Sequence, residues 1–170
     1  GVAFNLLKEL TLEENISWIP LIVPPKRAYK LIEEGNWCAS FFPAFGVQSY
    51  RQYKLGDTNV NIGLIRLALN SPFKWDSLTE LKGQTLAILR TGSNSDFAKQ
   101  FSESGVQLMF VENIESALNM VLLNRLDLAV MDNITYSRLP DNIKSRLQFS
   151  ENVVFSTPVS IYINSNCNIP

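Results

Sequence analysis

Short apolar segments alternate with amphipathic segments along most of this 170-residue chain. The apolar runs predict strands at 16–23, 38–42, 59–69, 85–89, 106–111, 126–131 and 153–163. Helical spacing and capping residues predict helices at 4–10, 26–34, 95–102, 114–124 and 133–139, with a short one near 77. Strands that alternate with helices are typical of βαβ units, in which a parallel sheet is covered on both faces. The sequence therefore predicts an α/β fold.

Charge and composition exclude several kinds of protein. Fifteen Lys and Arg against sixteen Asp and Glu give a net charge of -1, so we expect no nucleic-acid partner. The chain has no His, which excludes Ser-His-Asp and Cys-His nucleophiles and HExxH zinc sites. A hydrophobic fraction of 46% with 18% charged residues argues against disorder.

The two cysteines carry little information. Cys38 and Cys167 are too few and too far apart for a zinc ribbon or a CxxC redox pair. We expect two buried thiols, with a disulfide between them as the alternative. No metal and no cofactor are expected. No apolar run reaches the roughly 18–20 residues that a membrane span needs. The chain opens at Gly1 on a helical pattern with neither a Met start nor a signal peptide, so we expect a fragment.

In open α/β sheets, ligands bind outside the carboxyl ends of the strands, near the amino ends of helices. That rule directs attention to the polar residues that follow predicted strands. These are Arg51, Ser93 and Asp132.

Five segments carry a family resemblance. They are GVAFNLLKEL, PPKRAYKLIEEGNW, SYRQYKL, LTELKGQTLAILRTGSNSDF and ALNMVLLNRLDLAVMDN, in this order along the chain. In order and spacing they resemble the amino-acid-binding family of periplasmic solute-binding proteins of ABC transporters, the bacterial extracellular solute-binding protein family 3. The resemblance implies the two-lobed periplasmic-binding-protein type 2 fold.

The resemblance also implies a division of the chain. Lobe one would comprise 1–67 plus 162–170, and lobe two 68–161 with hinge strands at both junctions. The two lobes would be joined by crossing strands near 66–70 and 159–163. The family's opening strand and closing helices have no counterpart here, so the chain is expected to be truncated at both ends of lobe one.

Four residues, at three places in the chain, match positions with which the family binds an amino acid. Arg51 matches the arginine that binds an α-carboxylate; the alternative is a surface arginine. Gly92 and Ser93 lie in a turn that opens a helix and suits an anion, although Ser93 and Asp96 also fit a capping box. Asp132 would accept the α-ammonium, or else cap the helix that follows it.

Two further features concern the ligand. Phe42 and Phe45 stand where the family usually has small hydroxylated residues. This favours a ligand with an apolar or aromatic part, or else a relative that has lost the amino-acid site. Both side chains could instead belong to the core. Arg27 matches a position at the cleft edge, with a salt bridge or helix packing as the alternative. Asp127 is expected to be structural.

The implied function is extracytoplasmic binding of a small solute, an amino acid or related carboxylate, in an interlobe cleft for ABC-transporter uptake. The expected partners are that ligand and a membrane permease. The protein is expected to be a periplasmic monomer and not an enzyme. One alternative is a ligand-sensing input domain of a signalling protein, and another is a dehydratase-like enzyme on the same scaffold.

Overall fold

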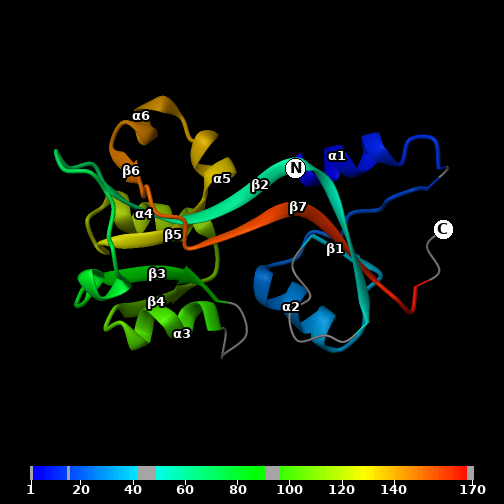
Figure 1. The fold of residues 1–170 in the computed structure, drawn as a ribbon, viewed down its shortest axis with the longest axis horizontal. Helices are drawn as coiled ribbons and strands as arrows, with labels where there is room; N and C mark the ends of the chain where they lie inside the picture. The colour runs from blue at the N-terminus through cyan, green and yellow to red at the C-terminus, as the bar shows by residue number, and fades with distance from the viewer. Residues whose placement is uncertain (1, 15, 42–48, 91–95, 168–170) are drawn as a thin grey trace. The chain divides into compact units, whose positions relative to one another are not determined.

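The computed structural model describes residues 2–14, 16–41, 49–90 and 96–167 (Figure 1). The chain divides into two compact units: unit 1 is Gly1–Asn59 with Thr157–Pro170, and unit 2 is Val60–Ser156. Two strands, β2 (Tyr50–Leu67) and β7 (Phe155–Asn164), each continue from one unit into the other. The lobe bounds that the sequence predicts, at 67 and 162, stay a prediction.

The described part of unit 1 contains two helices and a short strand besides its parts of β2 and β7. These are α1 (Val2–Leu10), α2 (Pro25–Glu33) and β1 (Ala39–Ser40). β1 pairs antiparallel with β7, with Ala39 opposite Ile163. Side-chain contacts connect β7 with β2: the rings of Tyr50 and Tyr162 lie 5.6 Å apart. The buried apolar side chains described in this unit are Leu7, Ile32, Leu55, Val159, Ile161, Tyr162 and Ile163.

Helix α2 begins and ends as its sequence predicts. Pro25 is in the first turn, where a residue without an N–H loses no helical bond. At the other end, Gly35 adopts a φ of 73°, and its N–H donates to the Ile32 carbonyl while Asn36 N–H donates to the Leu31 carbonyl. This pair of bonds is the Schellman motif, which favours glycine.

The strand predicted at 16–23 is wrong. Its described residues have no regular secondary structure, and Ile19 and Ile22 are 90% and 93% exposed. Pro20 removes a backbone donor from the middle of the segment, and a proline in a strand is restricted to edges and bulges. Apolar composition alone therefore misled the assignment.

The expectation of two buried thiols is also wrong, because Cys38 and Cys167 form a disulfide with their Cα atoms 5.5 Å apart. The pairing of β1 with β7 explains this. Cys38 directly precedes β1, and the N–H of Asn164 at the end of β7 donates to the Cys38 carbonyl. The sheet thus unites two residues that are 129 positions apart in sequence.

Unit 2 contains the parallel sheet that the sequence predicts. β3 (Thr85–Leu89) pairs in parallel with β4 (Gln107–Val111) on one side and β5 (Leu128–Asp132) on the other, and β5 pairs antiparallel with β2. The helices that the sequence predicts here are the 3₁₀ turn η1 (Leu78–Leu81), α3 (Asp96–Glu103), α4 (Ile114–Leu122) and α5 (Asn133–Ser137).

Alternate residues of these strands form two separate cores, one on each face of the sheet. Leu64, Leu86 and Leu128 pack with Phe101 of α3 and with Phe73 and Trp75. Their neighbours Ile65, Ala87 and Ala129 pack on the other face with Ala117 and Val121 of α4. The sheet of unit 2 is therefore covered on both faces, as its apolar strands predict.

Two elements of unit 2 are not predicted by the sequence. They are α6 (Asp141–Lys144) and β6 (Leu147–Phe149), and β6 pairs antiparallel with the end of β2. Each is too short to show a hydrophobic period, so only the neighbouring strand reveals β6.

Candidate ligand-binding site

The carboxyl ends of β3, β4 and β5 carry polar side chains. Because the three strands are parallel, their carboxyl ends lie at one edge of the sheet of unit 2. Arg90 directly follows β3, Glu112 directly follows β4, and Asp132 ends β5. Arg90 Nε lies 3.2 Å from Glu112 Oε1, and both side chains are largely exposed. The sequence analysis missed this ion pair, although both residues stand directly after predicted strands.

Asp132 caps helix α5, as one of its two predicted roles requires. Its Oδ1 accepts the Thr135 N–H at 2.8 Å, and its Oδ2 accepts the Thr135 hydroxyl at 2.6 Å. The side chain is half-buried. Each carboxylate oxygen can accept more than one hydrogen bond, so the cap leaves acceptor capacity for a cation. The contact with a ligand stays a prediction.

A second set of polar contacts adjoins Asp132. Asn133 Oδ1 accepts the backbone N–H of Asn61 at 2.9 Å. The Ser156 hydroxyl in turn donates to Asn61 Oδ1 at 2.7 Å. Asp132 pairs in register with Ile62, the next residue of β2. The sequence analysis assigned no role to these three residues, and since Asn61 and Ser156 are 95 positions apart, only the fold reveals the set.

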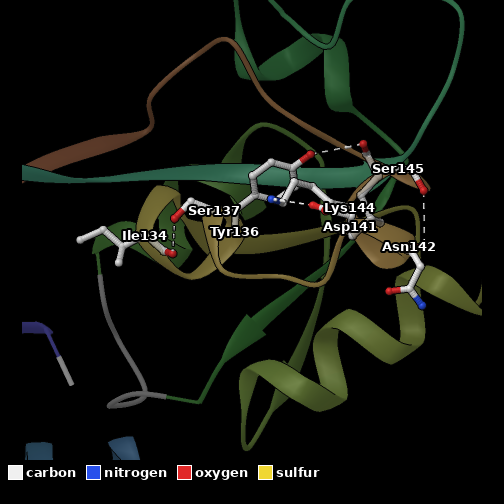
Figure 2. A network of polar contacts seen from close by, with 8 residues as sticks. Ile134, Tyr136, Ser137, Asp141, Asn142, Lys144 and Ser145 are labelled. Carbon is white, nitrogen blue, oxygen red and sulfur yellow. Dashed lines mark hydrogen bonds and ion pairs between the residues drawn. The ribbon is translucent and has the colours of Figure 1, made fainter.

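Helix α5 and its neighbour α6 carry several polar contacts (Figure 2), and Tyr136 connects α5 with β6. The Tyr136 hydroxyl donates to the Leu147 carbonyl of β6 at 3.3 Å, and its ring lies 5.2 Å from that of Phe149. Partial burial raises the pKa of Tyr136, so the phenol remains a neutral donor. Two further contacts are local to one helix each: Ser137 donates to the Ile134 carbonyl within α5, and Lys144 pairs with Asp141 at 3.6 Å within α6. Asp132 therefore stands at the start of a helix that Tyr136 connects with β6.

Arg51 lies in the part of β2 that belongs to unit 1. Its side chain is exposed, and its guanidinium carbon lies 5.9 Å from the centre of the Tyr53 ring. Gln52, on the opposite face of the strand, donates to Ser160 Oγ instead. Among the described residues, no carboxylate forms an ion pair with Arg51.

Arg66, in the unit 2 part of the same strand, has a different environment. It donates to Gln148 Oε1 and to the carbonyls of Ser71 and Pro72, and its guanidinium lies 4.4 Å from the Phe73 ring centre. Burial lowers the pKa of Arg66. Arg66 is thus a structural arginine that closes the turn after β2.

Arg27 is exposed in the first turn of α2, and its backbone N–H donates to the Pro24 carbonyl. Within the described ranges, it forms no salt bridge. Its role at the cleft edge stays a prediction. Arg51 and Arg27 belong to unit 1 and Asp132 to unit 2.

Four predicted site residues lie outside the described residues. Gly92 and Ser93 fall within 91–95, and Phe42 and Phe45 fall within 42–48. Their predicted contacts with a ligand, and the capping role of Ser93, therefore stay predictions.

The described part of the chain holds no group of three or more Cys, Asp or Glu side chains that could bind a metal ion. In the same part, none of the helices has the length and apolar character that crossing a membrane demands.

No protein-family model matches the sequence, and no curated protein matches it. Solved structures do match the fold. The GluR0 ligand-binding core in complex with L-glutamate has a TM-score of 0.75 and 15% identity, over 99% of this chain and 77% of that chain. The P235GK mutant of ArgBP from T. maritima has a TM-score of 0.72 and 14% identity, over 96% of this chain and 71% of that one.

A third similar structure is the periplasmic VFT2 domain of BvgS from Bordetella pertussis. Its TM-score is 0.66 at 14% identity, over 96% of this chain and 71% of that chain. At such identities the likeness establishes the fold alone. The fold predicted from the five sequence segments is confirmed: the chain has the α/β fold of the type 2 periplasmic solute-binding proteins.

Proposed function

We propose that this chain binds a small solute, an amino acid or a related small carboxylate, with residues of both units holding the ligand. Arg51 of unit 1 binds the carboxylate, and Asp132 of unit 2 accepts the α-ammonium. Gly92 and Ser93 add hydrogen bonds to the carboxylate, while Phe42, Phe45 and Arg27 shape the side-chain pocket. The two lobes follow the family's division, near residues 67 and 162.

The observation that carries this proposal is the environment of Arg51. A guanidinium stays charged at all physiological pH values and presents a planar fork to a carboxylate. Arg66 satisfies its donors within unit 2, whereas Arg51 is exposed and has no carboxylate partner among the described residues. An exposed, charged fork that no described carboxylate occupies is suited to an external carboxylate.

Recognition of a zwitterion needs opposite charges at a fixed separation. Asp132 supplies the negative charge, and its two bonds to Thr135 fix the direction of the carboxylate. Electrostatic pairing with both ends of the ligand would draw the units onto it, so that binding and closure are linked.

The similar structures support binding without bond chemistry. The GluR0 core is named as a ligand-binding core in complex with L-glutamate, and another match is an ancestral arginine-binding protein bound to arginine. On this proposal the chain is not an enzyme, acts as a monomer and delivers its solute to an ABC-transporter permease. The Cys38–Cys167 disulfide supports a periplasmic location, because disulfides persist in oxidising compartments.

A sensor role is the second candidate. The periplasmic VFT2 domain of BvgS has the same fold, so closure on a ligand could instead shift a signalling equilibrium. Protein sequence beyond the carboxyl end of this chain would distinguish a transporter component from a sensor. A membrane helix followed by a kinase or cyclase domain favours the sensor.

The test is a thermal-shift and calorimetric screen of the twenty amino acids and of small dicarboxylates. A ligand at about 100 times its Kd should stabilise the folded protein by about 2.7 kcal/mol. Arg51→Ala removes a charge-assisted pair, so the affinity for the best ligand should fall about 10- to 150-fold. In Arg51→Lys the affinity should fall less than in Arg51→Ala, because lysine keeps the positive charge and loses only the planar fork.

Arg125→Ala is the matched control, since Arg125 is an exposed arginine of unit 2. That variant should bind with unchanged affinity. If Arg51→Ala binds as tightly as the parent protein, the assignment of Arg51 is wrong. If no amino acid or dicarboxylate stabilises the protein, the proposed function is wrong.

A further inference from the structure

Both connections between the units carry a polar residue at the border of unit 2. Unit 2 begins at Val60 in β2 and ends at Ser156 in β7. Asn61 and Ser156 therefore lie at its border on the two connecting strands, and their side chains bond to each other at 2.7 Å. Deeper in unit 2, one residue from Asn61 and two from Ser156, the Val154 N–H donates to the Ile62 carbonyl at 2.8 Å.

The Asn61–Ser156 bond contributes nothing to the hydrophobic core. Ser156 is exposed and Asn61 is half-buried. It is instead a bond between the side chains of two strands at the point where each leaves unit 2. A cross-strand bond at this position restricts how far the two strands can bend independently.

A third residue connects this pair with the candidate site. Asn133 Oδ1 accepts a hydrogen bond from the Asn61 N–H at 2.9 Å, and Asn133 directly follows Asp132. Asp132 itself lies opposite Ile62 in the β2–β5 ladder. The strand that leaves unit 2 is therefore bonded to the residue next to the carboxylate.

We infer that Asn61, Asn133 and Ser156 form a polar clip that stiffens the two connecting strands and so pre-organises the units for ligand binding. Freedom that is lost on binding costs affinity, and a protein that is already restricted loses less of it. The clip lowers this cost without touching the ligand. Its effect on affinity depends on the proposed function, but its effect on the free protein does not.

The first test needs no ligand. Spin labels at Glu33→Cys in unit 1 and Glu115→Cys in unit 2 report the distribution of distances between the units by double electron–electron resonance. Both positions are exposed, and the native cysteines are held in the disulfide. Ser156→Ala should broaden the distribution in the ligand-free protein, and Ser156→Thr, which keeps the hydroxyl, should restore it.

Ser137→Ala is the matched control. Ser137 is also exposed, and among the described residues its hydroxyl bonds to the Ile134 carbonyl, within α5. Its distance distribution should equal that of the parent protein. A Ser156→Ala distribution as narrow as the parent's overturns the clip.

The second test measures affinity for the best amino acid of the screen. Ser156→Ala and Asn133→Ala should each weaken binding about two- to tenfold, the range of one hydrogen bond, with the distribution of the bound state unchanged. Unchanged affinity in both variants, while Asp132→Asn abolishes binding, overturns the pre-organising role and leaves the proposed function intact. If no amino acid binds at all, the proposed function fails, and the ligand-free distances alone decide on the clip.

Discussion

Gly63 lies in β2 where the strand passes directly against Phe149 and Ser150. A Cβ at this position would lie 2.7 Å from Phe149 Cζ and 2.8 Å from Ser150 Oγ. Ser150 cannot move freely, because its hydroxyl accepts the Leu64 N–H and donates to the Asn152 carbonyl. We therefore expect Gly63→Ala to destabilise unit 2 by about 1–3 kcal/mol, the usual cost of overpacking. Calorimetry of the full chain measures this change.

Phe149→Leu provides the control for Gly63, because a smaller side chain removes one of the two obstacles. The added methyl should cost less in this background than in the parent protein. An equal cost in both backgrounds would show that the clash with Phe149 is not the cause. A Gly63→Ala protein as stable as the parent would contradict the prediction outright.

At the scale of residues, the sequence predicts local roles better than distant partners. The capping role of Asp132 follows from its place before a helix, and Thr135 confirms it. The partners of Asn61 could not be predicted, because Asn133 and Ser156 are 72 and 95 residues away. Such pairs depend on strand order and register, which a single sequence does not specify.

Among the elements, β3 and β5 are held together at their amino ends by a reciprocal pair. Asp127 Oδ2 accepts both the N–H and the hydroxyl of Thr85 at 2.7 Å, and the Thr85 hydroxyl accepts the Asp127 N–H at 3.0 Å. The structural role expected of Asp127 is confirmed. Asp127→Ala leaves the Thr85 donors to water, so we expect unit 2 to lose about 1 kcal/mol of stability in chemical denaturation.

Asp141→Ala is the matched control for Asp127. Asp141 is likewise an exposed aspartate of unit 2, but it makes an exposed ion pair with Lys144 at 3.6 Å. Exposed pairs contribute little, so its stability should change by less than about 0.5 kcal/mol. Equal losses of stability in Asp127→Ala and Asp141→Ala would mean that the hydrogen bonds between Asp127 and Thr85 stabilise unit 2 no more than an exposed ion pair does.

Elements with a clear period and clear ends were predictable. The strand at 85–89 and the helix that starts at 114 match the structure, the latter because Asn113 caps it by accepting the Ser116 N–H. The structure of segment 16–23 was not predictable, because its apolar residues suggested a buried strand and the described structure leaves Ile19 and Ile22 exposed. β2 also extends back to Tyr50, through a polar stretch that lacks the hydrophobic pattern of a buried strand.

For the whole molecule, the fold class followed from the alternation of strands and helices, and the type 2 fold from five short motifs in order. The candidate site is less determined. Arg51 and Arg27 are described in unit 1 and Asp132 in unit 2, and the four remaining predicted contacts of the ligand fall within 42–48 and 91–95. The disulfide was not predictable, since nothing in the spacing of two cysteines indicates that β1 and β7 are neighbours.

The disulfide leads to a prediction about how the molecule unfolds. In the described structure, fewer apolar side chains are buried in unit 1 than in unit 2, and Ile19, Leu21 and Ile22 are exposed. Unit 1 therefore depends more on its covalent link between Cys38 and Cys167. Replacing both cysteines with Ser should destabilise unit 1 by about 2–4 kcal/mol and leave unit 2 unchanged.

Hydrogen exchange resolved by peptide separates the two units in this experiment. Amides of β1 and of the unit 1 part of β7 should exchange faster in the Cys38→Ser/Cys167→Ser protein, while those of β3 and β5 keep the parent rates. Dithiothreitol should reproduce the effect in the parent protein, because Cys38 is exposed, and should do nothing further to the variant. Faster exchange throughout both units would instead mean that they unfold as one cooperative body, and that the disulfide stabilises the whole chain rather than unit 1.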